Sequence, residues 1–361
     1  FRLPCESQAG LVPLTPALPT YPVDRTGNGR TLCRDRLDVL VSLRVALQLL
    51  DWALTDARWS VVTNNLRLFM IGRYPAEEAW RIWVCLAIVS VLAGTSAGTY
   101  GRVSRVLAVT TSAFQALIAI LVALSPIGLV AAAAYAANAA IVWVAMAASR
   151  RAAVPRRALT IGWIVSLPVI FVLIAGFAGT PLVTVGSNVW GGLLLTVLLA
   201  TVGIVLSFPF GVLLALGRRS HLPVVRILST AYIELIRGVP LVTILFMADL
   251  ILPLFLPAQW SLDRVARAMG GITLFSAAYV AENVRGGLQA IPSGQVEAAQ
   301  ALGLSAFRTT VHIVLPQALR SVIPANVGLF ISLLKDTTLV TIIGLLELLG
   351  IGSAVLAQSE S

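Results

Sequence analysis

Charged residues are scarce in this chain of 361 residues, where Asp, Glu, Lys and Arg together make up only 12%. An average soluble domain carries about a quarter. Hydrophobic residues account for 58% of the chain. This composition excludes an ordinary water-soluble domain and indicates a protein that uses lipid as its solvent.

Cysteine and histidine are also rare, with three residues and two residues respectively. Cys5, Cys33 and Cys85 form no CxxC pair, and His221 and His312 lie far apart. Zinc and haem sites need closely spaced ligands of these types. We therefore expect no metal or haem cofactor in this chain.

The net charge of +10 comes largely from arginines in short clusters between apolar runs. Cytoplasmic loops of membrane proteins carry such clusters. A basic tract with interleaved aromatic residues is absent, so we expect no nucleic-acid partner. The clusters at 101–105, 149–157 and 217–221 should be cytoplasmic, and the uncharged joints at 125–126 and 179–188 should be external.

The segment before residue 80 breaks this pattern, because its arginines at 58, 67 and 73 would then lie outside. Glu77 and Glu78 partly balance their positive charge. Residues 1–36 show no periodic apolar run and are predicted to be irregular. Residues 37–54 predict a helix that is a poor membrane span, either interfacial or a damaged first span. We treat 1–79 as an irregular and interfacial segment.

Apolar runs long enough to cross a bilayer follow in quick succession, since a span needs about 20 such residues. They lie at about 80–98, 104–124, 127–148, 158–178, 190–216, 224–256, 270–290 and 320–351. The predicted fold is an all-α, polytopic transmembrane helical bundle. Residues 80–180 would form accessory transmembrane helices, and residues 187–361 would form the core.

Acidic residues are missing from residue 79 to residue 233. They return afterwards at Glu234, Asp249, Asp263, Glu282, Glu297, Asp336 and Glu347. Ionisable residues within membrane segments are costly and are functional candidates by default. We therefore predict that the first spans support the bundle from the lipid side and that the later half of the chain carries the function.

Residues 297–316, EAAQALGLSAFRTTVHIVLP, are patterned rather than uniformly apolar. Residues 295–302 favour a short helix by propensity, and Gly303 is a typical helix stop. Ser305 can cap a second helix that starts at Ala306. The sequence predicts two helices joined at Gly303 on the cytoplasmic side, with small side chains that allow close approach by another protein.

This segment resembles the EAA signature of permease subunits of bacterial binding-protein-dependent ABC importers, through Glu297-Ala298-Ala299, Gly303 and Pro316. The stretches 232–246, 276–295 and 332–350 resemble the polar amino-acid branch, which includes histidine and glutamine importers. The likeness covers about 187–361. Residues 59–81 resemble the longer M-type permease of general L-amino-acid or glutamate/aspartate importers.

The resemblance implies a type I ABC importer permease core with extra N-terminal helices in the inner membrane, and a coupling loop at 291–316. Its partners would be a dimer of ATP-binding subunits, a second permease subunit and an external solute-binding protein, with polar L-amino acids as cargo. The residues implied to contact the ATP-binding subunit are Glu297, Ala298, Ala299, Gly303 and Arg308.

ATP itself is expected on a partner chain, because this chain lacks a Walker A loop. That loop needs glycines before a Gly-Lys-[Ser/Thr] sequence. The only lysine, Lys335 in LLKDTT, has no glycine before it. We therefore predict a transporter subunit that is not an enzyme.

Two polar stretches are candidates for the translocation path or its gate. In ELIRGVPL, Glu234 and Arg237 are helix neighbours that can pair, and Pro240 should break the helix. This stretch is either a hinged, path-lining span or an ion pair on an interfacial helix.

The second stretch is KDTT, where Lys335 and Asp336 are adjacent and do not face each other on a helix. Thr337 and Thr338 can bond back to the preceding turn. We expect either a helix break near the path or a connector at the cytoplasmic side or interface.

Three other polar features are expected to be structural. Glu282 and Arg285 should pair, Asn283 and Asn326 should join helices, and His312 should be packed or solvated.

Two rival functions remain open from the residues alone. An ion-coupled secondary amino-acid transporter would use Glu234, Asp336 and Glu347 as a relay, and a membrane scaffold or sensor would transport nothing. We also expect a further apolar helix after Ser361.

Overall fold

The computed structural model describes residues 41–48, 51, 59–125, 128–152, 154–177, 182–257 and 262–359. The chain divides into two units, Phe1–Trp59 and Ser60–Ser361. In the first unit, residues 41–48 and 51 are helical, which confirms that part of the helix predicted over 37–54. The other predictions for residues 1–58 lie outside the described residues.

The second unit is helical wherever the structure describes it, apart from turns and isolated bridges. Its N-terminal part consists of α2 (Trp59–Asn64), α3 (Leu66–Ile71), α4 (Trp80–Tyr100), α5 (Arg102–Ala123), α6 (Leu129–Ala152) and α7 (Arg156–Ala175). The last four are apolar and long enough to cross a bilayer. They confirm four predicted spans to within a few residues.

Small residues allow α4 and α6 to pack closely. A Cβ atom added to Gly94 would lie 2.2 Å from the carbonyl oxygen of Val142, so no larger residue fits there. Ala97 and Val142 are buried at the same contact. Close packing of small residues is a main source of helix association in lipid, where apolar burial gives little net gain.

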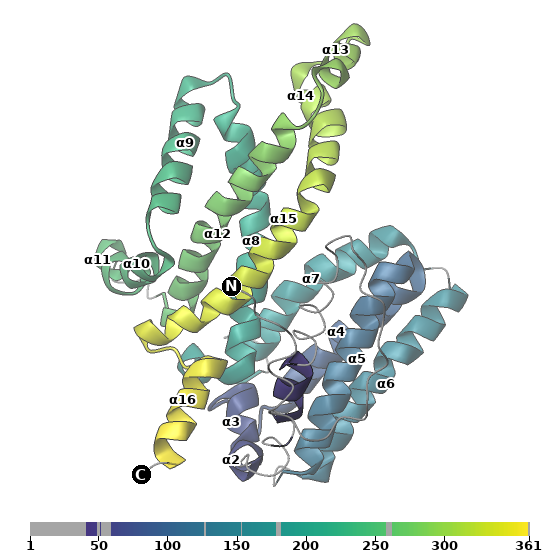
Figure 1. Ribbon diagram of the computed structural model, residues 1–361, viewed down its shortest axis with the longest axis vertical. Coiled ribbons are helices and arrows are strands. Elements are labelled where there is room, and N and C mark those ends of the chain that lie inside the picture. The colour runs from purple at the N-terminus through teal and green to yellow at the C-terminus, as the bar shows by residue number, and fades with distance from the viewer. Residues whose placement is uncertain are drawn as a thin grey trace, which may run out of the picture. The chain divides into compact units, whose positions relative to one another are not determined.

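The core comprises α8 (Gly192–Arg218), α9 (Pro223–Gly238), α10 (Leu241–Phe246), the π-helical turn η3 (Met247–Ile251), α11 (Leu252–Phe255), α12 (Arg264–Gln289), α13 (Ser293–Ala301), α14 (Ala306–Thr309), the π-helical turn η4 (Thr310–Val314), α15 (Leu315–Asp336), the 3-10 helix η5 (Thr337–Ile343) and α16 (Leu348–Ser359). Figure 1 shows α12 and α15 side by side, leading to the end that carries α13 and α14. The opposite end carries α16.

Three predicted core spans need correction. The run 224–256 is two helical pieces bent by 107°, because Pro240 cannot continue a helix. The run 270–290 begins earlier, at Arg264, where Asp263 accepts a hydrogen bond from the Ala266 amide. The run 320–351 is interrupted, because α15 ends at Asp336 and a 3-10 helix follows.

Two contacts tie residues 74–81 to the end of α7 and to the segment that follows it. The Tyr74 hydroxyl donates a 2.9 Å hydrogen bond to the Ile174 carbonyl, and burial raises the pKa of this hydroxyl, so it stays a donor. The buried Arg81 forms an ion pair of 2.8 Å with Glu78 and donates to the Val183 carbonyl. Arg81 therefore links the start of α4 to the segment after α7.

Glu347 fixes the start of α16. Its carboxylate is buried and accepts hydrogen bonds from the amides of Leu349 and Gly350, at 2.9 and 2.7 Å. The Thr341 hydroxyl donates a further bond of 3.2 Å. A carboxylate at a helix N-terminus is favoured by the free amides and by the helix dipole. These contacts give Glu347 a structural role.

Candidate functional site

Residues 291–316, the coupling segment, form the predicted pair of helices joined at a glycine. The first helix, α13, ends in a Schellman motif: the Gly303 amide bonds the Gln300 carbonyl and the Leu304 amide bonds the Ala299 carbonyl. Gly303 has φ +75°, which side chains with a Cβ rarely adopt. The predicted glycine stop is therefore confirmed in its detailed geometry.

The second helix starts where it was predicted. The Ser305 hydroxyl caps α14 by accepting a hydrogen bond from the Arg308 amide at 3.4 Å. The helix then widens into η4 before α15 begins, with Pro316 in its first turn. The chain thus leaves α12, forms a compact turn and returns along α15 (Figure 1).

The residues implied to contact the ATP-binding subunit do not all face outward. Glu297, Ala298, Gly303 and Arg308 are exposed, whereas Ala299 is buried within this chain. In the described part of the chain the Glu297 carboxylate has no ion pair. It is therefore available to a partner, while Ala299 serves the packing of the turn.

Two large apolar side chains of the coupling segment escaped prediction. Leu302 is 80% exposed and Phe307 is 74% exposed, on either side of the glycine turn. Leu302 directly precedes Gly303, and Phe307 lies in α14 after it. The stop and cap signals of the sequence located the turn but gave no indication that these two side chains are exposed.

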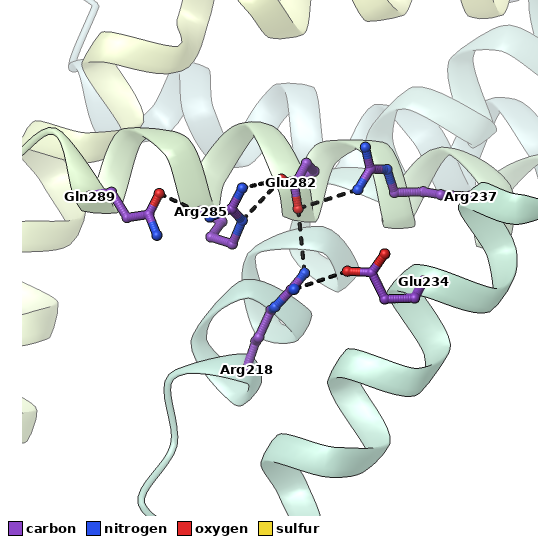
Figure 2. Close-up of polar contacts among 6 residues, drawn as sticks. All are labelled: Arg218, Glu234, Arg237, Glu282, Arg285 and Gln289. Carbon is purple, nitrogen blue, oxygen red and sulfur yellow. Dashed lines mark hydrogen bonds and ion pairs between the residues drawn. The ribbon is translucent and has the colours of Figure 1, made fainter.

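A second group of polar side chains, the ion-pair cluster, lies where α8, α9 and α12 meet (Figure 2). Its members are Arg218, Glu234, Arg237, Glu282, Arg285 and Gln289. α8 ends at Arg218, and α12 continues into the coupling segment after Gln289. The cluster is therefore joined to the coupling segment by a few residues of chain.

Glu282 is the centre of the ion-pair cluster. Its Oε2 atom lies 3.5 Å from both Arg218 Nη1 and Arg237 Nη1, and its Oε1 atom lies 3.0 Å from Arg285 Nε. The predicted Glu282–Arg285 pair is confirmed. One carboxylate thus bonds cations from three helices.

The predicted pairing of Glu234 with Arg237 is wrong. Glu234 Oε1 lies 2.9 Å from Arg218 Nη2, and Arg237 reaches Glu282 instead. Both side chains sit on α9 at neighbouring positions, yet each finds an oppositely charged partner on another helix. The two residues therefore link helices, and the interpretation as an isolated surface pair fails.

The second candidate stretch lies away from this cluster. α15 starts at the coupling segment and ends at Asp336, so Lys335, Asp336 and Thr337 lie one helix length away (Figure 1). The Thr337 and Thr338 hydroxyls bond the Leu334 and Lys335 carbonyls at 2.7 and 2.9 Å, as predicted. The predicted helix break is confirmed.

The remaining polar predictions agree with the structure. The Asn283 amide donates a 2.9 Å hydrogen bond to the Asn326 side chain, which joins α12 to α15. The His312 ring nitrogen Nδ1 lies 3.1 Å from the Arg308 carbonyl on an exposed turn. Among the described residues no group of three or more His, Cys, Asp or Glu side chains is placed to hold a metal ion.

Residues 207–354, which include the ion-pair cluster and the coupling segment, match the family described as "Binding-protein-dependent transport system inner membrane component". With the relative described next, this match shows that the chain belongs to this family of ABC importer permeases. Such permeases are multi-pass inner-membrane proteins and not enzymes, which confirms both predictions. ABC-type transport is supported over the ion-coupled alternative.

Individual relatives carry more specific names. The chain is 40% identical over 301 residues to "Inner membrane amino-acid ABC transporter permease protein YhdY" of Escherichia coli (strain K12), covering 82% of this chain and 67% of that protein. It is 49% identical over 172 residues to "Glutamate/glutamine/aspartate/asparagine transport system permease protein BztC" of Rhodobacter capsulatus, covering 47% and 40%.

A third relative is shorter. The chain is 40% identical over 170 residues to "Probable glutamine ABC transporter permease protein GlnP" of Bacillus subtilis (strain 168), which covers 47% of this chain and 77% of that protein. The domain boundaries predicted at 80–180 and 187–361 remain predictions.

Proposed function

We propose that this chain is one permease subunit of an ATP-driven importer of polar L-amino acids. It would work with a second permease subunit, two ATP-binding subunits and an external solute-binding protein. The names of the relatives, which include glutamate, glutamine, aspartate and asparagine, support amino acids as cargo. Binding and hydrolysis of ATP would belong to the partner, because this chain lacks the phosphate loop.

The coupling segment would transmit the motion of the ATP-binding subunit. The observation that carries this proposal is its exposed surface: the apolar Leu302 and Phe307 flank the glycine turn. Glu297 is exposed on the same segment and has no ion pair within the described residues. Apolar anchors within a polar rim are typical of protein–protein contacts. Arg308 is exposed on the same segment and would add a second charged contact.

Motion of the coupling segment would act on the ion-pair cluster through α12. Glu282 and Arg285 lie in the last two turns of that helix, directly before α13. A shift of α12 relative to α8 and α9 would stretch the contacts of Glu282 with Arg218 and Arg237. We infer that Glu234, Arg237 and the bend at Pro240 belong to a gate that this motion opens.

Lys335 and Asp336 would line the path near its external end, and Thr337, which is buried within this chain, would support the break beside them. Three observations support this: α15 breaks there, Asp336 is half-buried, and Lys335 is exposed beside it. Broken helices with charged residues often mark substrate paths in transporters. An amino-acid zwitterion carries both charge signs, which this pair complements.

The test is reconstitution of the full complex in liposomes with Gly303→Leu, measuring uptake of each amino acid and its stimulation of ATP hydrolysis. Leu at φ +75° strains the turn and should reduce coupled uptake at least tenfold, by displacing the exposed anchors. Gly270→Leu is the matched control, because Gly270 is helical with open space around its Cβ position. Normal uptake and assembly with Gly303→Leu would contradict the coupling role.

A further inference from the structure

Two adjoining hollows in the N-terminal helices share one arginine. The larger has a volume of about 400 Å³ and is lined mainly by apolar side chains from α3 to α6, including Met70, Ile82, Val122 and Ala131. Arg67 also lines it. Its volume lies in the range of about 300–1,000 Å³ that is usual for small-molecule sites.

The second hollow is polar and has a volume of about 370 Å³. Its lining includes Asn64, Asn65, Arg67 and Arg73. Arg67 is the residue common to both hollows. Arg67 therefore lines both a mainly apolar hollow and a hollow that also contains two asparagines and Arg73. An amphiphile has the same division into an apolar part and a polar part.

The apolar hollow lies at helix ends that are predicted to be external. Val122 lies at the end of α5, Ala131 near the start of α6 and Ile82 near the start of α4, which are the ends predicted to be external. Trp83 and Tyr135 also line the apolar hollow. Aromatic side chains of this type gather at the level of lipid headgroups.

The guanidinium groups of Arg67 and Arg73 can donate hydrogen bonds to a ligand. A guanidinium group carries five N–H donors, and Arg67 uses one for the Tyr74 carbonyl at 2.8 Å. Within the described residues neither Arg67 nor Arg73 forms an ion pair, and Glu78 is engaged by Arg81. Both arginines lie on the side where the positive-inside rule disfavours them, so an external anion would compensate them.

We propose that the joined hollows bind one anionic phospholipid, with its phosphate on Arg67 and Arg73 and part of one acyl chain in the apolar hollow. An acyl chain gains little by leaving the bilayer for an equally apolar hollow. Selectivity must therefore come from the headgroup, and the site should prefer an anionic lipid over a zwitterionic one. This lipid would hold α3 against the ends of α4, α5 and α6.

The experiment uses the intact complex in nanodiscs of equal phosphatidylglycerol and phosphatidylcholine, followed by native mass spectrometry of the lipids that remain bound. The wild type should retain one phosphatidylglycerol more per copy of this chain than Arg67→Gln or Ala131→Phe. Each arginine near a membrane surface contributes a factor of about five, so Arg67→Gln should lower phosphatidylglycerol retention about fivefold. Arg67→Lys should restore most of it.

The controls are Arg226→Gln and Ala133→Phe, which change exposed residues outside both hollows. An equal loss with these controls, or equal retention of the two lipids by the wild type, would overturn the proposal. The proposal would also be overturned if inorganic phosphate displaced the bound lipid and Ala131→Phe had no effect on lipid retention. That result would indicate a site for a free anion. If the external binding protein displaced the lipid from the same arginines, the proposal would also fail, and the surface would be assigned to that protein.

Discussion

Replacing Glu282 by Gln removes the negative charge at the centre of the ion-pair cluster and keeps the size of the side chain. The three arginines around it, from α8, α9 and α12, then lose their shared partner (Figure 2). Glu234 still pairs with Arg218. The substitution therefore weakens the link between the helix ends without opening a cavity.

The size of the effect follows from the burial of the group. The Glu282 side chain is 22% exposed and its partners are 26–34% exposed, so solvent screens each pair substantially. A screened pair contributes about 0.2–1 kcal/mol. Three pairs on one carboxylate, plus repulsion among the remaining arginines, give a cost of about 1–2 kcal/mol to the conformation seen here. That is roughly a 5- to 30-fold change in its population relative to a competing state.

The assay is ATP hydrolysis by the reconstituted complex without binding protein. If the ion-pair cluster stabilises the resting conformation, Glu282→Gln should raise this basal rate severalfold and lower its further stimulation by the liganded binding protein. Glu77→Gln is the matched control, because Glu77 is exposed and has no ion pair within the described residues. A double-mutant cycle with Arg218→Gln should give a coupling energy of about 0.5 kcal/mol or more.

The reasoning fails if the basal rate and the stimulation are unchanged while the variant assembles normally. It also fails if Glu282→Gln and Arg218→Gln act additively, because residues that share no interaction behave in that way. A drop in both rates, with loss of the ATP-binding subunit from the purified complex, would assign the ion-pair cluster to assembly instead of gating.

Three further outcomes are expected. Phe307→Asp should weaken binding of the ATP-binding subunit at least tenfold in a pull-down titration, without changing the thermal stability of the permease, because the side chain is 74% exposed. Asn326→Leu should lower the thermal unfolding midpoint, since it leaves the Asn283 amide without its partner at a cost of about 0.6–1.7 kcal/mol. Glu347→Ala should destabilise the chain by about 2 kcal/mol in denaturant unfolding, because two amides of α16 lose their acceptor.

The helices of the bundle were predictable because bilayer thickness limits their length. Apolar runs located α4 to α8, and the glycine and serine signals located the turn at Gly303 and the cap at Ser305. These are local rules: a helix stop or cap depends on residues within one turn of it. The early start of α12 was missed because Arg264 and Arg267 make its first turn polar, and their partner, Asp249, comes from another helix.

The partners of charged residues were not predictable from spacing. Glu234 and Arg237 have the spacing of a helical pair, but the neighbouring helices supply competing partners, and tertiary contacts decided the pairing. Glu347 differs, because the amides that it caps belong to Leu349 and Gly350 and lie within one turn of it. Sequence spacing shows which pairs are possible within one helix. The charged residues at the ends of α8 and α12 determine which pairs form.

The charges at the ends of α8, α9 and α12 add to an apolar contact that includes Ala215, Ile233 and Val284, and they have a mechanical consequence. Apolar packing between helices in a membrane is short-ranged and close to neutral against lipid, so it provides weak discrimination between two arrangements. A carboxylate shared by arginines from three helices has an energy that changes with distance over several ångströms. Because Glu282 lies on the helix that continues into the coupling segment, a displacement at Gly303 would change that energy directly. A movement of the coupling segment would therefore act on the contacts that link α8, α9 and α12.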